Sequence, residues 1–222
     1  MDSGVQFSLS GASLTYGRHS VLHDITLTIR EGEKVALIGP SGAGKSSLLD
    51  LLWQQSPDNI ALCPQESGLV DILSVYQNIY MGGLGRFSGV YNFLNLIRPW
   101  PARRAEVADI ARALGVEDKL RTSPDKLSGG QRQRVALGRA LYRQKSIFFG
   151  DEPVSSLDPE QGEQLLALIL SRHQTAVVAI HNPALACQHF DRVIALKNGH
   201  VVGDWQTRNL DLAVLEAVYQ NA

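Results

Sequence analysis

Residues 35–47 read Val-Ala-Leu-Ile-Gly-Pro-Ser-Gly-Ala-Gly-Lys-Ser-Ser, and this stretch decides the class of fold. Eight of them, followed by Ser47, fit the pattern G-x-x-x-x-G-K-[ST]: Gly39, Pro40, Ser41, Gly42, Ala43, Gly44, Lys45 and Ser46. Backbone N–H groups in such a loop surround phosphate oxygens at the positive end of a helix dipole. Lys45 would reach the β- and γ-phosphates, and the Ser46 hydroxyl would bind Mg²⁺.

The alternative for residues 39–46 is a flexible glycine loop without a ligand. Average composition gives roughly one chance match per hundred chains of this length. Here an apolar run precedes the pattern and a helical pattern, residues 45–54, follows it, which is the context that phosphate binding requires. We therefore predict a nucleotide site and call residues 39–46 the phosphate loop.

A second segment, Ile147-Phe148-Phe149-Gly150-Asp151-Glu152, carries two carboxylates at the end of an apolar run. Ligands of α/β sheets bind at the carboxyl ends of the strands. Asp151 would hold Mg²⁺, through water, and Glu152 would position or deprotonate the attacking water. A strand that ends in Asp-Glu is usually only a solvated turn, but behind a phosphate loop it indicates nucleotide hydrolysis.

The pentapeptide Leu127-Ser128-Gly129-Gly130-Gln131 is the most specific motif, since composition gives roughly one chance match in a few thousand. It precedes a helical pattern over residues 129–142, so Ser128 can cap that helix and the glycines expose N–H groups that bind anions. The chain already has a phosphate loop. A second phosphate-binding element therefore predicts a nucleotide that is held by another subunit.

Composition and charge exclude several classes of protein. The formal net charge is −1, so no basic field points to nucleic acid, and we expect no nucleic-acid partner. Cys63 and Cys187 lie far apart without a CxxC pattern, which favours unpaired thiols in a reducing compartment. The N-terminus lacks the pattern of a signal peptide. No apolar run approaches the ~20 residues that span a bilayer, so a membrane process would need other chains.

The periodicity predicts an α/β fold with a mostly parallel sheet covered by helices on both faces. Alternating strands are expected within residues 5–30, and Asn198-Gly199 between two apolar runs predicts a hairpin. The other expected strands are 35–38, 60–63, 147–149 and 176–180, and the other expected helices are 102–114, 160–170 and 211–219.

In this order, the phosphate loop, the LSGGQ motif and the Asp-Glu pair resemble the ATPase subunits of ABC transporters. The resemblance implies a P-loop NTPase-type fold in a single ATPase domain over residues 1–222. Residues 1–65 and 145–222 would form a RecA-like core with a reduced antiparallel β region. Residues 66–144 would form an α-helical subdomain that carries the signature Leu127–Gln131.

The same resemblance assigns four smaller motifs. Tyr16 matches the aromatic residue that stacks on adenine, and Gln65 matches the Q-loop glutamine that senses Mg²⁺ and the γ-phosphate. Residues Ser155–Asp158 match the D-loop, which lies at the dimer interface, and Asp158 is the last residue of this motif. His181 matches the switch histidine, which contacts the γ-phosphate. Without the resemblance Tyr16 would be a packed tyrosine, Gln65 a loop amide and His181 an ordinary histidine.

The resemblance implies catalytic roles for Glu152, His181, Gln65 and Lys45, and Mg²⁺ ligation by Ser46, Gln65 and Asp151. The implied ligands are ATP and Mg²⁺. The implied partners are a second ATPase subunit, most simply a second copy, transmembrane permease subunits and, for an importer, a periplasmic or extracellular solute-binding protein. The chain would then lie in the cytoplasm, peripheral to the inner face of the membrane. An ATPase of a soluble complex, such as one for phosphonate breakdown, and an exporter ATPase remain alternatives.

Two segments depart from the family pattern. Gln65 follows Ser46 by only 19 positions, about half the usual spacing, so residues 53–60 replace a larger β region or its strands come from elsewhere. Residues 81–104 are glycine-rich and aromatic, and they resemble the phosphonate-importer branch. They predict either a variable surface loop or a groove for a partner's coupling helix, built by the aromatic residues Phe87, Tyr91, Phe93 and Trp100.

Overall fold

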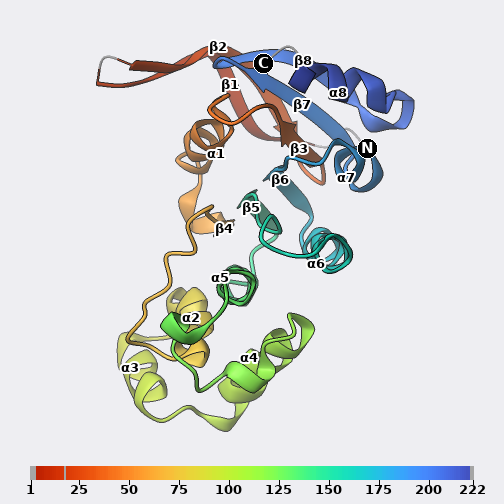
Figure 1. The fold of residues 1–222 in the computed structure, drawn as a ribbon. Helices are drawn as coiled ribbons and strands as arrows, with labels where there is room; N and C mark the ends of the chain where they lie inside the picture. Colours follow the sequence, from red (N-terminus) through yellow and green to blue (C-terminus); the bar gives the residue numbers. More distant parts are fainter. Residues whose placement is uncertain (1–3, 18, 221–222) are drawn as a thin grey trace.

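A six-stranded sheet forms the centre of the computed structural model, which describes residues 4–17 and 19–220 (Figure 1). The strand order is β4-β5-β6-β3-β7-β8. The strands are β3 (Lys34–Ile38), β4 (Ile60–Cys63), β5 (Ile147–Asp151), β6 (Thr175–Ala179), β7 (Arg192–Lys197) and β8 (His200–Gln206). All neighbours pair in parallel except β7 and β8, which form the antiparallel hairpin at Asn198-Gly199. The predicted mostly parallel sheet is confirmed.

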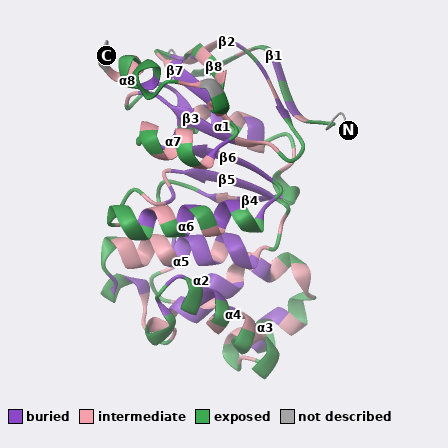
Figure 2. Cartoon of the chain, turned by 90° about the vertical axis from the view of Figure 1, so that its right-hand side faces the viewer, coloured by how far each residue is buried: buried purple, intermediate pink, exposed green. Residues whose placement is uncertain are grey.

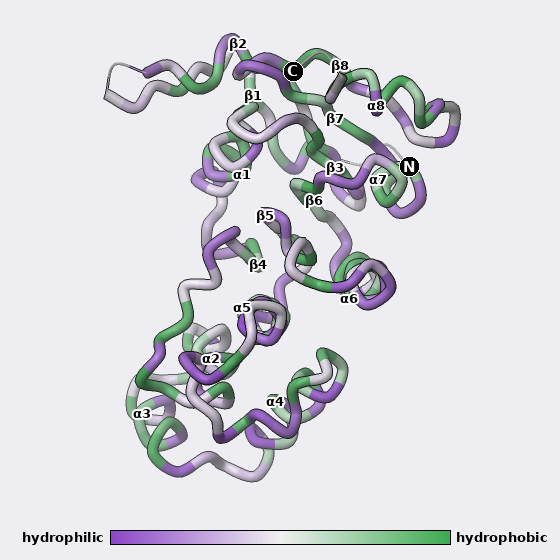
Figure 3. The backbone as a smooth tube through the Cα atoms, in the orientation of Figure 1, coloured by the Kyte–Doolittle hydropathy of each residue, from purple (hydrophilic) through white to green (hydrophobic). Residues whose placement is uncertain are grey.

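Both faces of the sheet are covered, and alternate residues of one strand enter different cores. Ala36 and Ile38 pack into the core beneath the helices α5 (Gly129–Tyr142), α6 (Pro159–Arg172) and α7 (Pro183–His189). Val35 and Leu37 pack into the second core, which is shared with the helix α1 (Lys45–Trp53) and the hairpin of β1 (Val5–Tyr16) and β2 (His19–Arg30). This two-sided burial explains why the strands read as continuous apolar runs. The inner strands β3, β5 and β6 are almost entirely buried in Figure 2, and β3 and β7 are coloured hydrophobic in Figure 3.

The N-terminal β region is a two-stranded hairpin, β1 (Val5–Tyr16) with β2 (His19–Arg30). Between α1 and β4 the chain makes only a turn and the short helix η1 (Pro57–Asn59). Among the described residues, the antiparallel sheet therefore has no strands beyond these two, and the shortened segment 53–60 is a trimmed connection.

The helices complete the architecture and mostly match the predicted ranges. They are α1 (Lys45–Trp53), α2 (Val75–Tyr80), α3 (Gly89–Ile97), α4 (Pro101–Ala113), α5 (Gly129–Tyr142), α6 (Pro159–Arg172), α7 (Pro183–His189) and α8 (Leu212–Gln220). Shorter turns are η2 (Met81–Arg86), η3 (Glu117–Lys119), η4 (Pro124–Lys126) and η5 (Thr207–Asn209). No helix in the described ranges is long and apolar enough to cross a membrane.

Residues 81–104 form helices, so their interpretation as a variable surface loop is wrong. Ser88 caps α3 through the Tyr91 N–H (3.4 Å), and Pro101 starts α4, where its missing N–H costs nothing. The rings of Phe87 and Tyr91 lie 5.0 Å apart, and Tyr91 stacks on Trp100 at 6.0 Å. These aromatic contacts join α3 to α4 at the end of the molecule farthest from the hairpin (Figure 1).

Both cysteines are free thiols, as predicted. Cys63 is buried, and burial raises its pKa to about 12.

Candidate functional site

The phosphate loop joins β3 to α1, and its glycines are required by its shape. Gly39, Gly42 and Gly44 have φ angles of 142°, 77° and 102°, which other residues rarely adopt. A Cβ atom on Gly39 would lie 2.1 Å from the Leu196 carbonyl oxygen. The loop therefore packs directly against the end of β7.

Lys45 is held over the phosphate loop. Its side chain is buried, and Nζ donates hydrogen bonds to the carbonyl oxygens of Gly39 (2.8 Å) and Pro40 (3.0 Å). Burial lowers the pKa of Lys45, and the nearby charges of Glu152 and Asp151 partly oppose that shift. The ammonium group is thus preorganised beside two carboxylates and can neutralise an anionic ligand.

A cavity of about 190 Å³ lies above the loop and unites several predicted residues. It is lined by Val21, Ser41, Gly42, Ala43, Gly44, Lys45, Ser46, Ser47, Gln65 and Glu152. Gln65 comes from the segment after β4 and Glu152 from the end of β5, so the fold brings both to the phosphate loop. Gln65, Glu152 and the phosphate loop meet because each follows a strand of the parallel order β4-β5-β6-β3, so all three lie at the same edge of the sheet.

Asp151 is the buried carboxylate of the site. Its side chain is 8% exposed, and the Ser46 hydroxyl donates a hydrogen bond to it. Burial raises the pKa of Asp151, the Ser46 hydrogen bond lowers it, and the charge of Glu152 raises it further. The predicted metal ligands Ser46 and Asp151 are therefore already in contact.

Glu152 sits in a sparsely populated backbone conformation, with φ of 51°. Its N–H donates to the Ala179 carbonyl of β6 (3.0 Å). Its carboxylate contacts Nε2 of His181, which follows β6. Two groups predicted separately from the sequence thus form one pair beside the phosphate loop.

The signature forms the first turn of α5, away from the phosphate-loop cavity. Ser128 and Gln131 form a reciprocal capping box. The Gln131 N–H donates to the Ser128 hydroxyl (3.3 Å), and the Ser128 N–H donates to the Gln131 side-chain oxygen (3.0 Å). Gly129 lines a separate cavity of about 190 Å³ together with Gln65. The N–H groups of Gly129 and Gly130 thus begin a 14-residue helix but do not line the cavity at Lys45.

Tyr16 and Asp158 also lie outside the phosphate-loop cavity. Tyr16 ends β1 opposite His19 and is 56% exposed, while Val21 of β2 lines the cavity instead. Asp158 caps α6 through the Gln161 N–H (3.0 Å). It lines a neighbouring cavity, which also contains Glu152 and His181.

Sequence reasoning missed two residues at the site. The Tyr219 hydroxyl of α8 accepts a hydrogen bond from the Gly39 N–H (3.2 Å), 180 positions away in the chain. The Gln133 amide of α5 contacts the Glu152 carbonyl (2.6 Å) and the Ser156 N–H (2.9 Å). Gln133 lies two positions after the signature, which was the available signal, whereas Tyr219 stands in no motif.

Residues 22–155 match the sequence profile of the family described as "ABC transporter". The chain belongs to the ABC transporter ATP-binding family. Among curated relatives, the phosphonates import ATP-binding protein PhnC of Pseudomonas putida is 36% identical, over 99% of this chain and 91% of the relative. PhnC 1 of Natronomonas pharaonis is 34% identical over 96% of this chain and 99% of the relative.

Solved structures of the ABC cassette agree with this assignment. The dimeric bacterial ABC transporter cassette MJ0796 is 26% identical, with a TM-score of 0.80, over 92% of this chain and 100% of that one. A dimeric post-hydrolysis state of MJ0796, bound to ADP and Pi, has a TM-score of 0.78 at the same identity and coverage. This ABC ATPase therefore binds ATP, hydrolyses it to ADP and phosphate, and serves as the ATPase subunit of a transporter.

Proposed function

We propose that this ABC ATPase powers the import of a phosphonate or a related small oxyanion. The observation that carries the proposal is the near full-length similarity to several phosphonates import ATP-binding proteins at about 35% identity. An importer also needs a solute-binding protein and a permease, and the ATPase would work at the cytoplasmic face of the membrane.

The residues of the site take these roles in the proposal. The phosphate loop with Ser47 binds the ATP phosphates, Lys45 neutralises the β/γ-oxygens, and Tyr16 stacks on adenine. Glu152 takes a proton from the attacking water while His181 holds its carboxylate and faces the γ-phosphate. Gln65, which lines the same cavity as Glu152, orients the water.

Mg²⁺ fits the donors that are present. The Ser46 hydroxyl, the Asp151 carboxylate and the Gln65 amide oxygen are hard oxygen ligands, and they lie at or beside one cavity. Within the described ranges no group of three or more His, Cys, Asp or Glu residues could hold a metal, so ATP oxygens and water would complete the shell. When bound, Mg²⁺ neutralises the charge on the β- and γ-phosphates.

The signature would act on the ATP of a second subunit. Ser128, Gly129, Gly130 and Gln131 begin a helix whose N–H groups can bind a γ-phosphate, yet they are absent from the phosphate-loop cavity of their own chain. Two copies that meet head to tail would bring each signature to the other's phosphate loop, with Asp158 at the interface. The dimeric MJ0796 cassettes support this arrangement.

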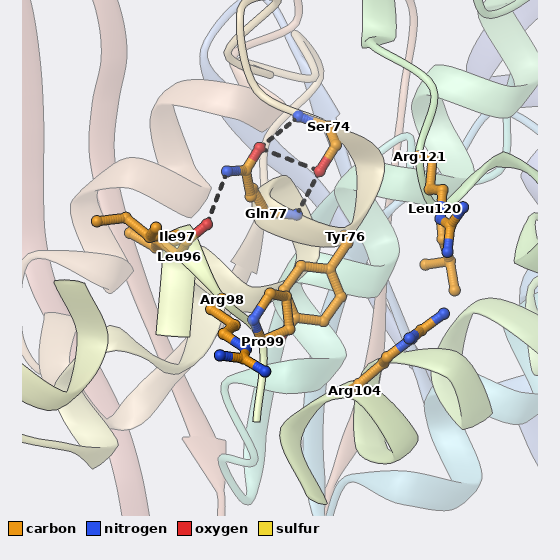
Figure 4. Close-up of a pocket in the computed structure, with 10 residues that line it drawn as sticks. All are labelled: Ser74, Tyr76, Gln77, Leu96, Ile97, Arg98, Pro99, Arg104, Leu120 and Arg121. Carbon is orange, nitrogen blue, oxygen red and sulfur yellow. Dashed lines mark hydrogen bonds between the residues drawn. The ribbon is translucent and has the colours of Figure 1, made fainter. Parts of the chain in front are cut away.

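A pocket of about 530 Å³ at the helical end is the proposed docking place for the permease (Figure 4). Arg98, Arg104 and Arg121 line it, and Arg104 and Arg121 point toward one another. Their guanidinium groups make no hydrogen bond or ion pair with other described residues. Three uncompensated arginines match an acidic segment of the partner.

An apolar stripe on α3 adjoins this pocket and extends the proposed surface. Its exposed members recur at helical spacing: Val90, Phe93, Leu94 and Ile97. Of the four aromatic residues predicted to face a partner, Phe93 is 64% and Trp100 46% exposed. Phe87 and Tyr91 instead pack against each other within the chain. The surface therefore combines a basic pocket with an apolar ridge, as partner interfaces often do.

Expression with the neighbouring genes tests the proposal. Copurification with a permease and a solute-binding protein, together with ATP-dependent phosphonate uptake into vesicles, is the expected result. Copurification with soluble enzymes only would identify a cytosolic complex, and a permease that works without a binding protein would identify an exporter. Either outcome would overturn import.

A further inference from the structure

Gln133 spans two elements that the ATPase reaction needs. Its side chain leaves α5 two positions after the signature and reaches the loop after β5. Nε2 donates a hydrogen bond to the Glu152 carbonyl (2.6 Å), and Oε1 accepts one from the Ser156 N–H (2.9 Å). Both polar ends of one amide are therefore used on the same loop, which fixes its distance from α5.

The Glu152 peptide needs such support because of its conformation. A φ of 51° is unfavourable for a residue with a side chain and persists only when neighbouring contacts hold it. The Ala179 carbonyl holds the N–H side of Glu152. On the carbonyl side, Gln133 donates alongside the hydroxyl and N–H groups of Ser155 (3.1 and 3.2 Å). Gln133 is the one donor in this set that comes from outside the loop.

The signature also touches this loop directly. A Cβ atom on Gly130 would lie 3.0 Å from the Ser156 carbonyl oxygen and 3.3 Å from Leu157. The start of α5 and the D-loop therefore pack without space between them. A displacement of the signature must be passed to Ser156, and the Gln133 amide passes the same displacement to the Glu152 peptide.

We infer that Gln133 is a positioning residue that links the signature of a subunit to the catalytic carboxylate of the same subunit. The inference rests on the proposed shared sites, in which the signature contacts the ATP of the partner while Glu152 serves the subunit's own ATP. When the dimer closes and a subunit's signature binds the partner's nucleotide, Gln133 positions that subunit's Glu152 carboxylate for its own nucleotide. The two sites of a dimer would then be coupled through one side chain in each subunit.

Two substitutions separate positioning from folding. Gln133→Met keeps the length and loses both hydrogen bonds, so kcat should fall about tenfold or more, with KM for ATP little changed and the Hill coefficient closer to one. Gln133→Glu can accept from Ser156 at every pH, but it can donate to Glu152 only when its carboxyl group is protonated. Its kcat relative to wild type should therefore rise as the pH is lowered from about 8.5 to about 6. Gln164→Met, on the exposed surface of α6, is the matched control and should behave as wild type.

The outcomes distinguish this inference from the proposed function. Wild-type protein without ATPase activity or an ATP-dependent dimer would refute the shared sites themselves. An active, dimerising wild type with kcat of Gln133→Met within about twofold of it would overturn the linkage alone. A flat pH ratio for Gln133→Glu, or a loss of activity that follows a lowered melting temperature in both variants, would likewise overturn it.

Discussion

The two ends of this ABC ATPase differ in whether their charged side chains have partners within the described chain. Around the phosphate loop, Lys45, Asp151 and Glu152 all find partners within the chain, in loop carbonyls, the Ser46 hydroxyl and His181. At the helical end, Arg98 and Arg104 have no partner among the described side chains, and α3 leaves apolar residues in solvent.

The difference indicates which kind of ligand or partner each end binds. A preorganised site needs only its small ligand and the second subunit, because its donors are already oriented. The exposed apolar ridge of α3 instead lowers solubility unless a protein partner covers it, and the arginines beside it favour an acidic partner. Most other arginines of the helical end are paired, for example Arg103 with Glu106 (2.9 Å) and Arg112 with Glu117 (2.7 Å), so the unpaired group is local.

The largest effect should come from the catalytic end. Glu152→Gln removes the carboxylate that accepts the proton, so kcat should fall about 100-fold or more while ATP binding persists. Steady-state hydrolysis and ATP binding of the purified protein check this. A rate near that of wild type would remove Glu152 from catalysis.

The helical end should respond in transport and leave hydrolysis intact. Changing Arg98, Arg104 and Arg121 together to Glu should lower permease copurification about tenfold or more, because three attractions become repulsions. ATPase activity of the isolated subunit should stay within about twofold. Arg208→Glu, an exposed arginine on η5, is the control for net charge. Equal recovery of the permease with wild type, the triple arginine variant and Arg208→Glu would contradict the proposed contrast between the two ends.

The smallest effect concerns the stability of the catalytic end. Because burial raises the pKa of Asp151, the folded state holds its proton more tightly than the unfolded state, and that stabilisation is lost as the pH rises through the raised pKa. Without Mg²⁺ at neutral pH, Asp151→Asn should therefore raise Tm by about 2 °C and should lower Mg²⁺-dependent hydrolysis.

Calorimetry at several pH values tests the Asp151 prediction. The gain in Tm should shrink as the pH falls through the raised pKa of Asp151, because the wild-type carboxyl group then takes up a proton. Asp118→Asn is the control, since Asp118 is fully exposed and the Lys119 contact lowers its pKa. A lower Tm for Asp151→Asn at neutral pH would contradict the account.

Much of the fold was predictable because its signals are local. The apolar runs gave the strands, and Ser128 before Gly129 marked the start of α5 correctly. The helix α7 was missed, although Asn182-Pro183 is a cap and first-turn signal that could have revealed it. The helix α3 was missed because glycines and aromatic residues obscured its apolar face. Its buried Asn92 and Asn95 form hydrogen bonds with Tyr80 and Tyr76 of α2, and no local pattern records those contacts.

The site was predictable where motifs define it and unpredictable where tertiary contacts do. Residues of the phosphate loop and Asp151 could be chosen from their motifs, and His181 from the family resemblance. The contacts of Gln133 with Glu152 and of Tyr219 with Gly39 join segments whose approach depends on the whole fold. The proposed place of Tyr16 beside adenine likewise depends on the hairpin, whose end carries Tyr16 outside the phosphate-loop cavity.

The central claim is that each active site is shared between two subunits, and mixing two inactive variants tests it most directly. Lys45→Ala damages the phosphate loop, and Ser128→Arg places bulk and charge where the partner's γ-phosphate would bind. In a mixed dimer both defects fall on one site and leave the other intact. The account predicts that ATPase activity, absent from each variant alone, returns on mixing in equal amounts. It should reach at most about a quarter of the wild-type rate, because half of the dimers are mixed, each has one intact site, and the defective site cannot assist it through Gln133. A mixture no more active than its components would contradict shared sites.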